Sequence, residues 1–107
     1  TLEDHHIFPA AYLGKLRGPD GKSYPSDRIN CVVNRTLIAD KTNKAISKSS
    51  PSRYLDEILP AEGASAILNS HYIDAEARSA MQVDDYEAFL YAREHTLIAE
   101  MIKRILG

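Results

Sequence analysis

The longest hydrophobic pattern in the chain lies near its C-terminus. From Tyr86 to Ile105, apolar residues recur three or four positions apart, as they do along one face of an α-helix. Asp84 and Glu87 form a pair typical of a capping box at the start of such a helix. The pattern predicts a helix over about 85–106. Its expected core-facing residues are Tyr86, Phe89, Leu90, Leu97, Ile98, Met101, Ile102 and Ile105.

Shorter helical patterns precede this one. Ser50-Pro51 combines a capping residue with a proline, which is favoured in the first turn of a helix, and Pro60 would end the helix that follows. Its apolar positions are Tyr54, Leu55, Ile58 and Leu59. Two further helices are predicted over 62–69 and, capped by Asp74, over 75–81.

The pattern at the N-terminus is that of a short strand followed by a loop. Residues 4–8 favour a strand that ends at Pro9, because proline cannot continue the ladder of hydrogen bonds. Residues 10–13 favour a helical turn. The stretch from Gly14 to Arg28 contains Gly-Pro-Asp-Gly and Tyr-Pro-Ser-Asp, which are turn sequences, so we expect a loop there.

A second strand is predicted over 31–39, where β-branched residues are frequent, with an interruption at Asn34. Asp40 is a candidate cap for a following helix that would carry Asn43 in its first turn. Strand, loop, strand, short helix and then several longer helices predict an α+β fold.

Composition fits a globular domain. A chain of 107 residues with 44% hydrophobic and 26% charged residues is expected to fold as a single domain. No apolar run approaches the roughly 20 residues of a membrane helix, and no signal-peptide pattern opens the chain, so we expect no membrane partner. The single cysteine, Cys31, excludes an internal disulfide and a CxxC zinc knuckle and fits a cytoplasmic setting. Because the first residue is Thr1, we expect a piece of a longer protein whose other domains are partners.

Charge is unevenly distributed along the chain. The formal net charge of −2 is unfavourable for a free-standing nucleic-acid-binding domain. Residues 15–53, however, hold nine Lys and Arg residues against Asp20, Asp27 and Asp40. A basic half and an acidic half predict a polar molecule with one nucleic-acid-binding face.

The residues with the clearest chemistry are two adjacent histidines and two asparagines. His5 and His6 lie just ahead of Pro9, and Asn34 and Asn43 are nine residues apart. Hydrolysis of a phosphodiester needs a base that deprotonates water and positive charge on the phosphate. A histidine suits the first task and a divalent cation the second. These residues therefore predict hydrolysis with one bound metal ion.

Each of these residues has an expected role. His6 is the candidate general base, His5 a metal ligand, and Asn43 a second ligand through its amide oxygen. Asn34 is expected to orient the His6 imidazole through a hydrogen bond. Neighbours on a regular strand face opposite sides, so His5 and His6 act together only if the strand ends or twists there. Asp4, on the same face as His6, is the alternative ligand.

These segments resemble the HNH, or ββα-metal, endonuclease family. Asp-His-His-Ile-Phe-Pro and the two asparagines carry that resemblance, and the string through Pro-Ser-x-Tyr-Leu is similar to the C-terminal nuclease domain of GmrSD-like restriction systems. By this resemblance, His5 takes the metal-ligand place, His6 the base, Asn34 the middle position and Asn43 the helix ligand.

The resemblance implies a ββα-metal unit over 1–50, packed against several C-terminal α-helices over 51–107. It also implies a DNA endonuclease of low sequence specificity, belonging to a restriction or defence protein. The implied cofactor is one divalent cation, Mg²⁺ or Mn²⁺. The imidazole of His5 beside an amide oxygen suits Zn²⁺ or Ni²⁺ as well.

Other interpretations stand beside these. A set of basic side chains either contacts phosphates or forms a solvated face: Arg35, Lys41, Lys44 and Lys48. His71 and His95 are expected to have structural roles, since neither has a ligand-spaced neighbour. The rival function is a non-catalytic module that binds nucleic acid or protein and retains the ββα fold. RNA is an alternative substrate, because the chemistry is shared.

Overall fold

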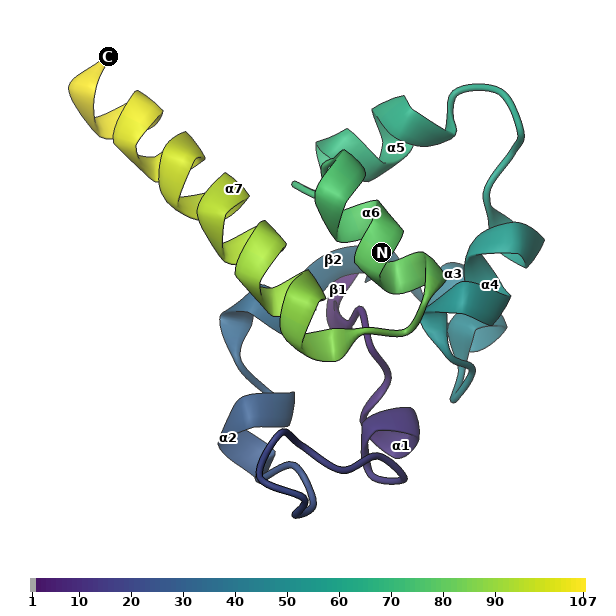
Figure 1. Ribbon diagram of the computed structural model, residues 1–107. Coiled ribbons are helices and arrows are strands. Elements are labelled where there is room, and N and C mark those ends of the chain that lie inside the picture. The colour runs from purple at the N-terminus through teal and green to yellow at the C-terminus, as the bar shows by residue number, and fades with distance from the viewer. Residues whose placement is uncertain (1) are drawn as a thin grey trace. The chain divides into compact units, whose positions relative to one another are not determined.

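The computed structural model describes residues 2–107 and has an α+β fold (Figure 1). A two-stranded antiparallel sheet is accompanied by several helices. The chain divides into two compact units, the first ending at Ile58 and the second comprising Leu59–Gly107. Among the described residues, no helix is long and apolar enough to cross a membrane.

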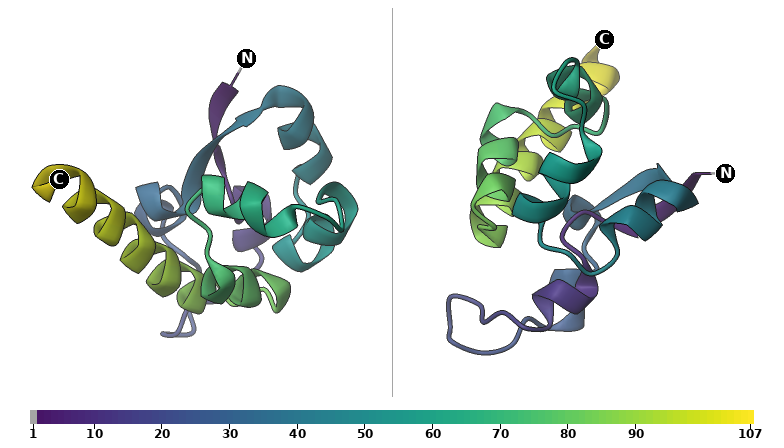
Figure 2. Two further views of the ribbon diagram at one scale, coloured as in Figure 1. Left: turned by 90° about the horizontal axis from the view of Figure 1, so that it is seen from above. Right: turned by 90° about the vertical axis from the view of Figure 1, so that its right-hand side faces the viewer.

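The sheet pairs β1 (Leu2–His6) with β2 (Arg35–Ala39). The register runs from Leu2 opposite Ala39 to His6 opposite Arg35. Figure 2 shows the two strands side by side from two further directions. His6 is therefore the last paired residue of β1, at the point where the chain leaves the sheet.

The end of the first strand and the start of the second both differ from the sequence prediction. The prediction extended the first strand to residue 8, but the backbone of Phe8 bonds to the side chain of Asn34 instead of to a strand. The second strand was predicted from residue 31, yet Val32–Asn34 form a 3₁₀ turn. The predicted interruption at Asn34 is confirmed.

The segment between the strands contains two single-turn helices. The predicted turn over 10–13 is confirmed as α1 (Ala10–Leu13). The expected loop from Gly14 to Arg28 is interrupted near its end by α2 (Ser26–Ile29), so that part of the prediction was wrong. A tight turn between Arg17 and Ser23 fills the remainder, with Gly21 at a positive φ of 78°.

Two helices complete the first unit. α3 (Asp40–Ile46) begins directly after β2 and contacts both strands, and α4 (Pro51–Ile58) contacts α3. Asp40 lies in the first turn of α3 without capping it, since Ala39 is the N-cap and no side chain bonds there. The Tyr54 hydroxyl donates to the Ile7 carbonyl at 2.6 Å. This bond ties α4 to the end of β1, and α4 belongs to the first compact unit.

The second unit is helical: α5 (Ala64–Ser70), α6 (Ala75–Gln82) and α7 (Tyr86–Leu106), with α6 packed on α7. The predicted cap at Asp74 is confirmed, because its side chain accepts from Ala77 N at 2.9 Å. A second oxygen of Asp74 accepts from the Thr96 hydroxyl at 3.2 Å, which ties α6 to α7.

The start of α7 differs by one residue from the prediction. Asp85, not Asp84, is the N-cap, and its side chain accepts from Ala88 N at 3.1 Å. Asp84 instead turns the chain between α6 and α7 at a positive φ of 56°.

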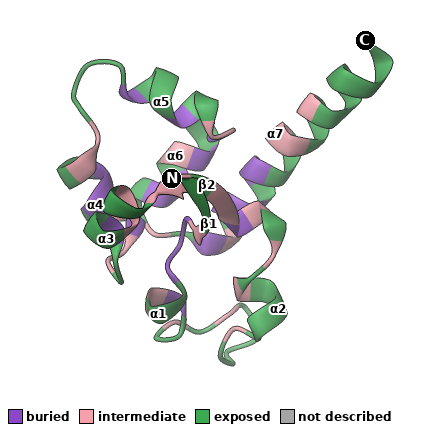
Figure 3. Cartoon of the chain, turned by 180° about the vertical axis from the view of Figure 1, so that it is seen from behind, coloured by how far each residue is buried: buried purple, intermediate pink, exposed green. Residues whose placement is uncertain are grey.

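The apolar face of α7 is buried only near its N-terminal end (Figure 3). Tyr86, Phe89 and Leu90 are buried, whereas a second group is exposed: Ile98, Met101, Ile102 and Ile105. The prediction that the whole face belongs to the core was therefore wrong. At about 1.5 Å per residue, α6 is roughly 12 Å long and α7 about 32 Å, so α6 covers only the first turns.

Candidate active site

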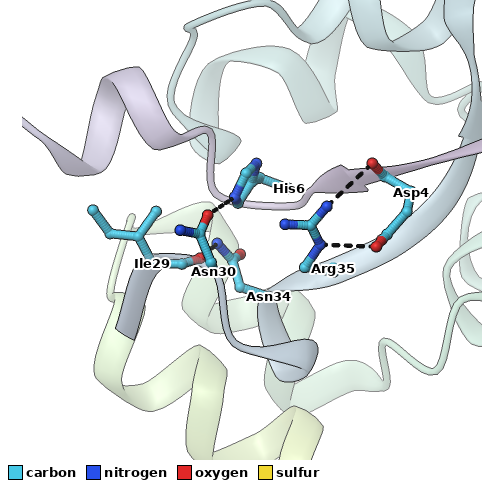
Figure 4. A network of polar contacts seen from close by, with 6 residues as sticks. All are labelled: Asp4, His6, Ile29, Asn30, Asn34 and Arg35. Atoms are coloured by element: carbon cyan, nitrogen blue, oxygen red, sulfur yellow. Dashed lines mark hydrogen bonds and ion pairs between the residues drawn. The ribbon is translucent and has the colours of Figure 1, made fainter. Parts of the chain in front are cut away.

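His6 lies at the end of β1 and is half-buried, with its side chain directed toward α2 (Figure 4). Its Nε2 atom is 2.7 Å from Oδ1 of Asn30, the residue that ends α2. The imidazole is thus held by a side chain 24 residues away along the chain.

The predicted hydrogen bond from Asn34 to His6 is not formed. Asn34 is fully buried, and its Oδ1 accepts from Phe8 N at 2.7 Å. Its Nδ2 donates to the carbonyl oxygens of Phe8 and Ile29, each at 3.0 Å. A buried amide must be paired, and the nearby backbone groups take up its donors and acceptor. Asn34 therefore joins Phe8 to Ile29. Phe8 lies two residues after His6, and Ile29 is the residue before Asn30.

Arg35 and Asp4 occupy the same sheet face as His6. Side chains alternate along a strand, so Asp4 and His6 share a face with Leu37 and Arg35, their register partners. Arg35 Nε donates to Asp4 Oδ2 at 2.9 Å, as Figure 4 shows. Asp4 was the alternative metal ligand, but it lies on the face opposite to His5 and binds a guanidinium.

His5 lies on the other face, opposite Thr36, and its side chain is 21% exposed. Its Nε2 atom is buried and has no hydrogen-bond partner within residues 2–107. The Glu3 carboxylate is 3.4 Å away, which is ion-pair distance without hydrogen-bond geometry. A buried nitrogen beside a carboxylate is a donor pair that fits a divalent cation.

Asn43 lies in the first turn of α3 and is half-buried. Its helix contacts both strands, so it belongs to the same small unit as His5. In the described part of the chain, no three His, Cys, Asp or Glu side chains form a metal-binding group. A cation at His5 would therefore depend on Glu3, an amide oxygen and water.

The basic residues predicted to contact phosphates differ in whether they form ion pairs. Arg35 is ion-paired with Asp4, and Lys44 with Asp40 at 3.1 Å on the surface of α3. Lys41 and Lys48 are exposed in and just after α3. Exposed ammonium groups are the better candidates for phosphate contacts.

The remaining histidines lie in the second unit. The carbonyl of His71 accepts from Arg93 at 3.1 Å, and burial, followed by the charge of Arg93, lowers the pKa of its imidazole. His95 packs on Tyr91 with ring centroids 4.4 Å apart. These contacts support the structural roles predicted for both.

Two side chains of this region were missed at the level of sequence. Glu3 could have been found, because it is two residues before His5 and strand alternation puts both on one face. Asn30 gives no such signal. Its contact with His6 depends on a loop path that no periodicity encodes.

The sequence of this chain is similar to that of a longer protein. The chain is 31% identical over 127 residues to the Uncharacterized protein MJ0686 of Methanocaldococcus jannaschii, covering 97% of this chain and 21% of that protein. The chain thus spans about a fifth of the length of the curated relative it matches. No family model matches the chain, and no solved structure matches it significantly.

Proposed function

We propose that this chain is a metal-dependent endonuclease that hydrolyses DNA phosphodiester bonds and forms part of a restriction or defence protein. The observation that carries the proposal is His6: half-buried at a strand end, held by one amide hydrogen bond, and opposite the cationic Arg35. The order β1, β2, α3, with α3 contacting both strands, supports an HNH-like ββα unit over these elements.

The chemical step assigned to His6 is removal of a proton from water. A ring nitrogen takes the proton while the water oxygen bonds to phosphorus, and the opposite P–O bond breaks. The leaving oxygen then takes a proton from solvent, and the imidazolium releases its proton to solvent, which restores the neutral ring. General-base catalysis of this kind contributes about 10²–10⁴-fold.

Metal ligation is assigned to the other face of β1. His5, Glu3 and Asn43 would hold a divalent cation, whose positive charge would act on a phosphate oxygen and the leaving oxygen. The buried Nε2 of His5, which has no hydrogen-bond partner among the described residues, supports this assignment, since an unmade hydrogen bond at a buried polar atom is costly unless something binds there. Two oxygen donors beside one imidazole suit Mn²⁺ and Mg²⁺, with Zn²⁺ and Ni²⁺ as alternatives.

The position of the substrate follows from the alternation along β1. His5 and His6 face opposite sides of the sheet, so one phosphate can be reached by both only where the strand stops. β1 stops at His6. We therefore place the scissile phosphate past the end of β1.

The charge distribution supports DNA binding by the first unit. Residues 2–58 contain nine Lys and Arg against seven Asp and Glu, whereas residues 59–107 contain four against eight. Phosphate contacts need the basic surface.

A plasmid-nicking assay tests the proposal. Supercoiled DNA is incubated with the chain and Mg²⁺, Mn²⁺, Ni²⁺ or Zn²⁺, with and without EDTA. We expect nicking that needs a metal and that disappears in His6→Ala while calorimetric Mn²⁺ binding is retained. A parallel incubation with RNA tests whether the substrate is DNA or RNA.

His95→Ala is the matched control, since it removes an exposed histidine of the second unit. Binding of DNA without metal-dependent cleavage would support the rival non-catalytic module. Cleavage by His6→Ala at the parental rate would remove His6 from the mechanism.

A further inference from the structure

The contact between His6 and Asn30 specifies which ring nitrogen carries the proton. Nε2 of His6 lies 2.7 Å from Oδ1 of Asn30. An amide oxygen only accepts hydrogen bonds, so the imidazole must donate, with its proton on Nε2. Nδ1 is then left with a free lone pair.

We propose that Asn30 is a positioning residue that fixes His6 in the Nε2–H tautomer, so that Nδ1 is the atom that takes the proton from water. This inference deepens the proposed function and rests on it. Asn30 does not touch the reacting atoms in this arrangement; it acts through the ring.

Asn30 is well placed for this task because its own backbone is anchored. Its N–H donates to the Ser26 carbonyl at 2.8 Å, which closes the single turn of α2. The preceding carbonyl, that of Ile29, accepts from the buried Asn34 amide. The same amide binds Phe8, two residues after His6. One buried side chain therefore fixes the backbone on both sides of the His6–Asn30 pair.

The hydrogen bond also persists through the proton transfer. When Nδ1 accepts the proton, the ring becomes a cation and Nε2–H still points at the amide oxygen. A hydrogen bond from a charged donor is stronger than one from a neutral donor. Asn30 thus holds the orientation of the ring throughout the step.

The test combines a spectroscopic and a kinetic measurement on the whole chain. Nitrogen-15 NMR of the His6 ring at about pH 9, above the ordinary range of histidine pKa values, reports the tautomer. We expect one Nε2–H form in the parent. In Asn30→Leu we expect a mixture of the two tautomers.

The kinetic readout is nicking with Mn²⁺. Loss of an orienting hydrogen bond typically costs 10–100-fold, so we expect kcat of Asn30→Leu to fall by about that factor with KM unchanged. Asn30→Asp keeps an acceptor at the same reach and should recover both the tautomer and most of kcat. Asp27→Leu places the same side chain at another exposed position of α2 and should change neither.

Different failures have different meanings. An Nδ1–H form in the parent, or a parental kcat in Asn30→Leu, would overturn the role of Asn30. A raised KM with kcat unchanged would also overturn it, because Asn30 would then contact DNA. If the parent shows the Nε2–H form but no metal-dependent cleavage, the proposed function fails and the assignment of the tautomer stands.

Discussion

At the scale of single residues, burial gives two identical side chains different tasks. The Asn34 amide is fully enclosed and binds only backbone, whereas Asn30 is exposed and binds an imidazole. A buried polar group that loses its partner is costly, while an exposed one is resolvated. Asn34 should therefore matter for stability and Asn30 for activity.

Asn34→Ala tests the first half of this contrast. The substitution leaves Phe8 N–H and the carbonyls of Phe8 and Ile29 without their partner, so we expect the free energy of unfolding to fall by about 3 kcal/mol or more. Urea denaturation measures it. Asn69→Ala, the same change at an exposed helical position, should alter it by less than about 0.5 kcal/mol. Equal effects of the two would contradict the role of the buried amide.

The second prediction at this scale concerns which side chains bind the proposed cation. Glu3→Gln and Asn43→Ala should each weaken Mn²⁺ binding by about tenfold or more, because the first removes the negative charge of a ligand and the second removes an oxygen donor. Asp4→Asn is the control, since its carboxylate lies on the opposite face and binds Arg35. Isothermal calorimetry measures the affinities. If Asp4→Asn weakens binding and Glu3→Gln does not, the cation lies on the His6 face.

At the scale of elements, local sequence signals predicted the helices and long-range contacts decided the rest. The proline that begins α4 and the carboxylate before α6 act on adjacent backbone, and both helices formed where expected. The strand ends were missed because a side chain 26 residues away competes for the backbone of Phe8. The exposed half of α7 was missed because apolar spacing does not reveal the length of the neighbouring helix.

The same distinction applies to the candidate site. Strand alternation and motif spacing suffice to find His5 and His6. The contact between Asn30 and His6 depends on how the loop returns to the sheet. The spacing of residue types along the sequence does not predict that path.

The cap of α7 gives a prediction at this scale. Asp85→Ala should lower the free energy of unfolding by about 1 kcal/mol, because Ala88 N–H loses its acceptor. Asp84→Gly should not lower it, since glycine readily adopts the positive φ found there. Thermal unfolding followed by circular dichroism compares them. The opposite order would support the capping box expected from the sequence.

At the scale of the whole molecule, charge separates the two units. The first has a basic excess and the second an acidic one, so the negative net charge of the chain does not describe the surface that would contact DNA. Under the proposed function, the acidic unit would lower non-specific affinity for DNA, whereas the phosphate contacts would be made by the basic unit.

Salt dependence tests this separation. In a His6→Ala background, which avoids cleavage, Lys41→Ala with Lys48→Ala should weaken binding to a DNA duplex and reduce the salt slope by up to about 2. Lys103→Ala, an exposed lysine of α7, should leave the slope unchanged. Fluorescence anisotropy at several salt concentrations gives the slopes. A slope altered only by Lys103→Ala would transfer DNA binding to the second unit.

The amide of Asn34 has a consequence for how such a chain can vary. Its hydrogen bonds to Phe8 and Ile29 close the segment between these two residues. The residues in the middle of that segment therefore contribute little to holding the end of β1. Doubling the length of a flexible loop costs only about 0.6 kcal/mol in closure entropy. Insertions near Gly21 should therefore be tolerated, and a descendant protein could acquire a new segment there while His6 keeps its place at the end of β1.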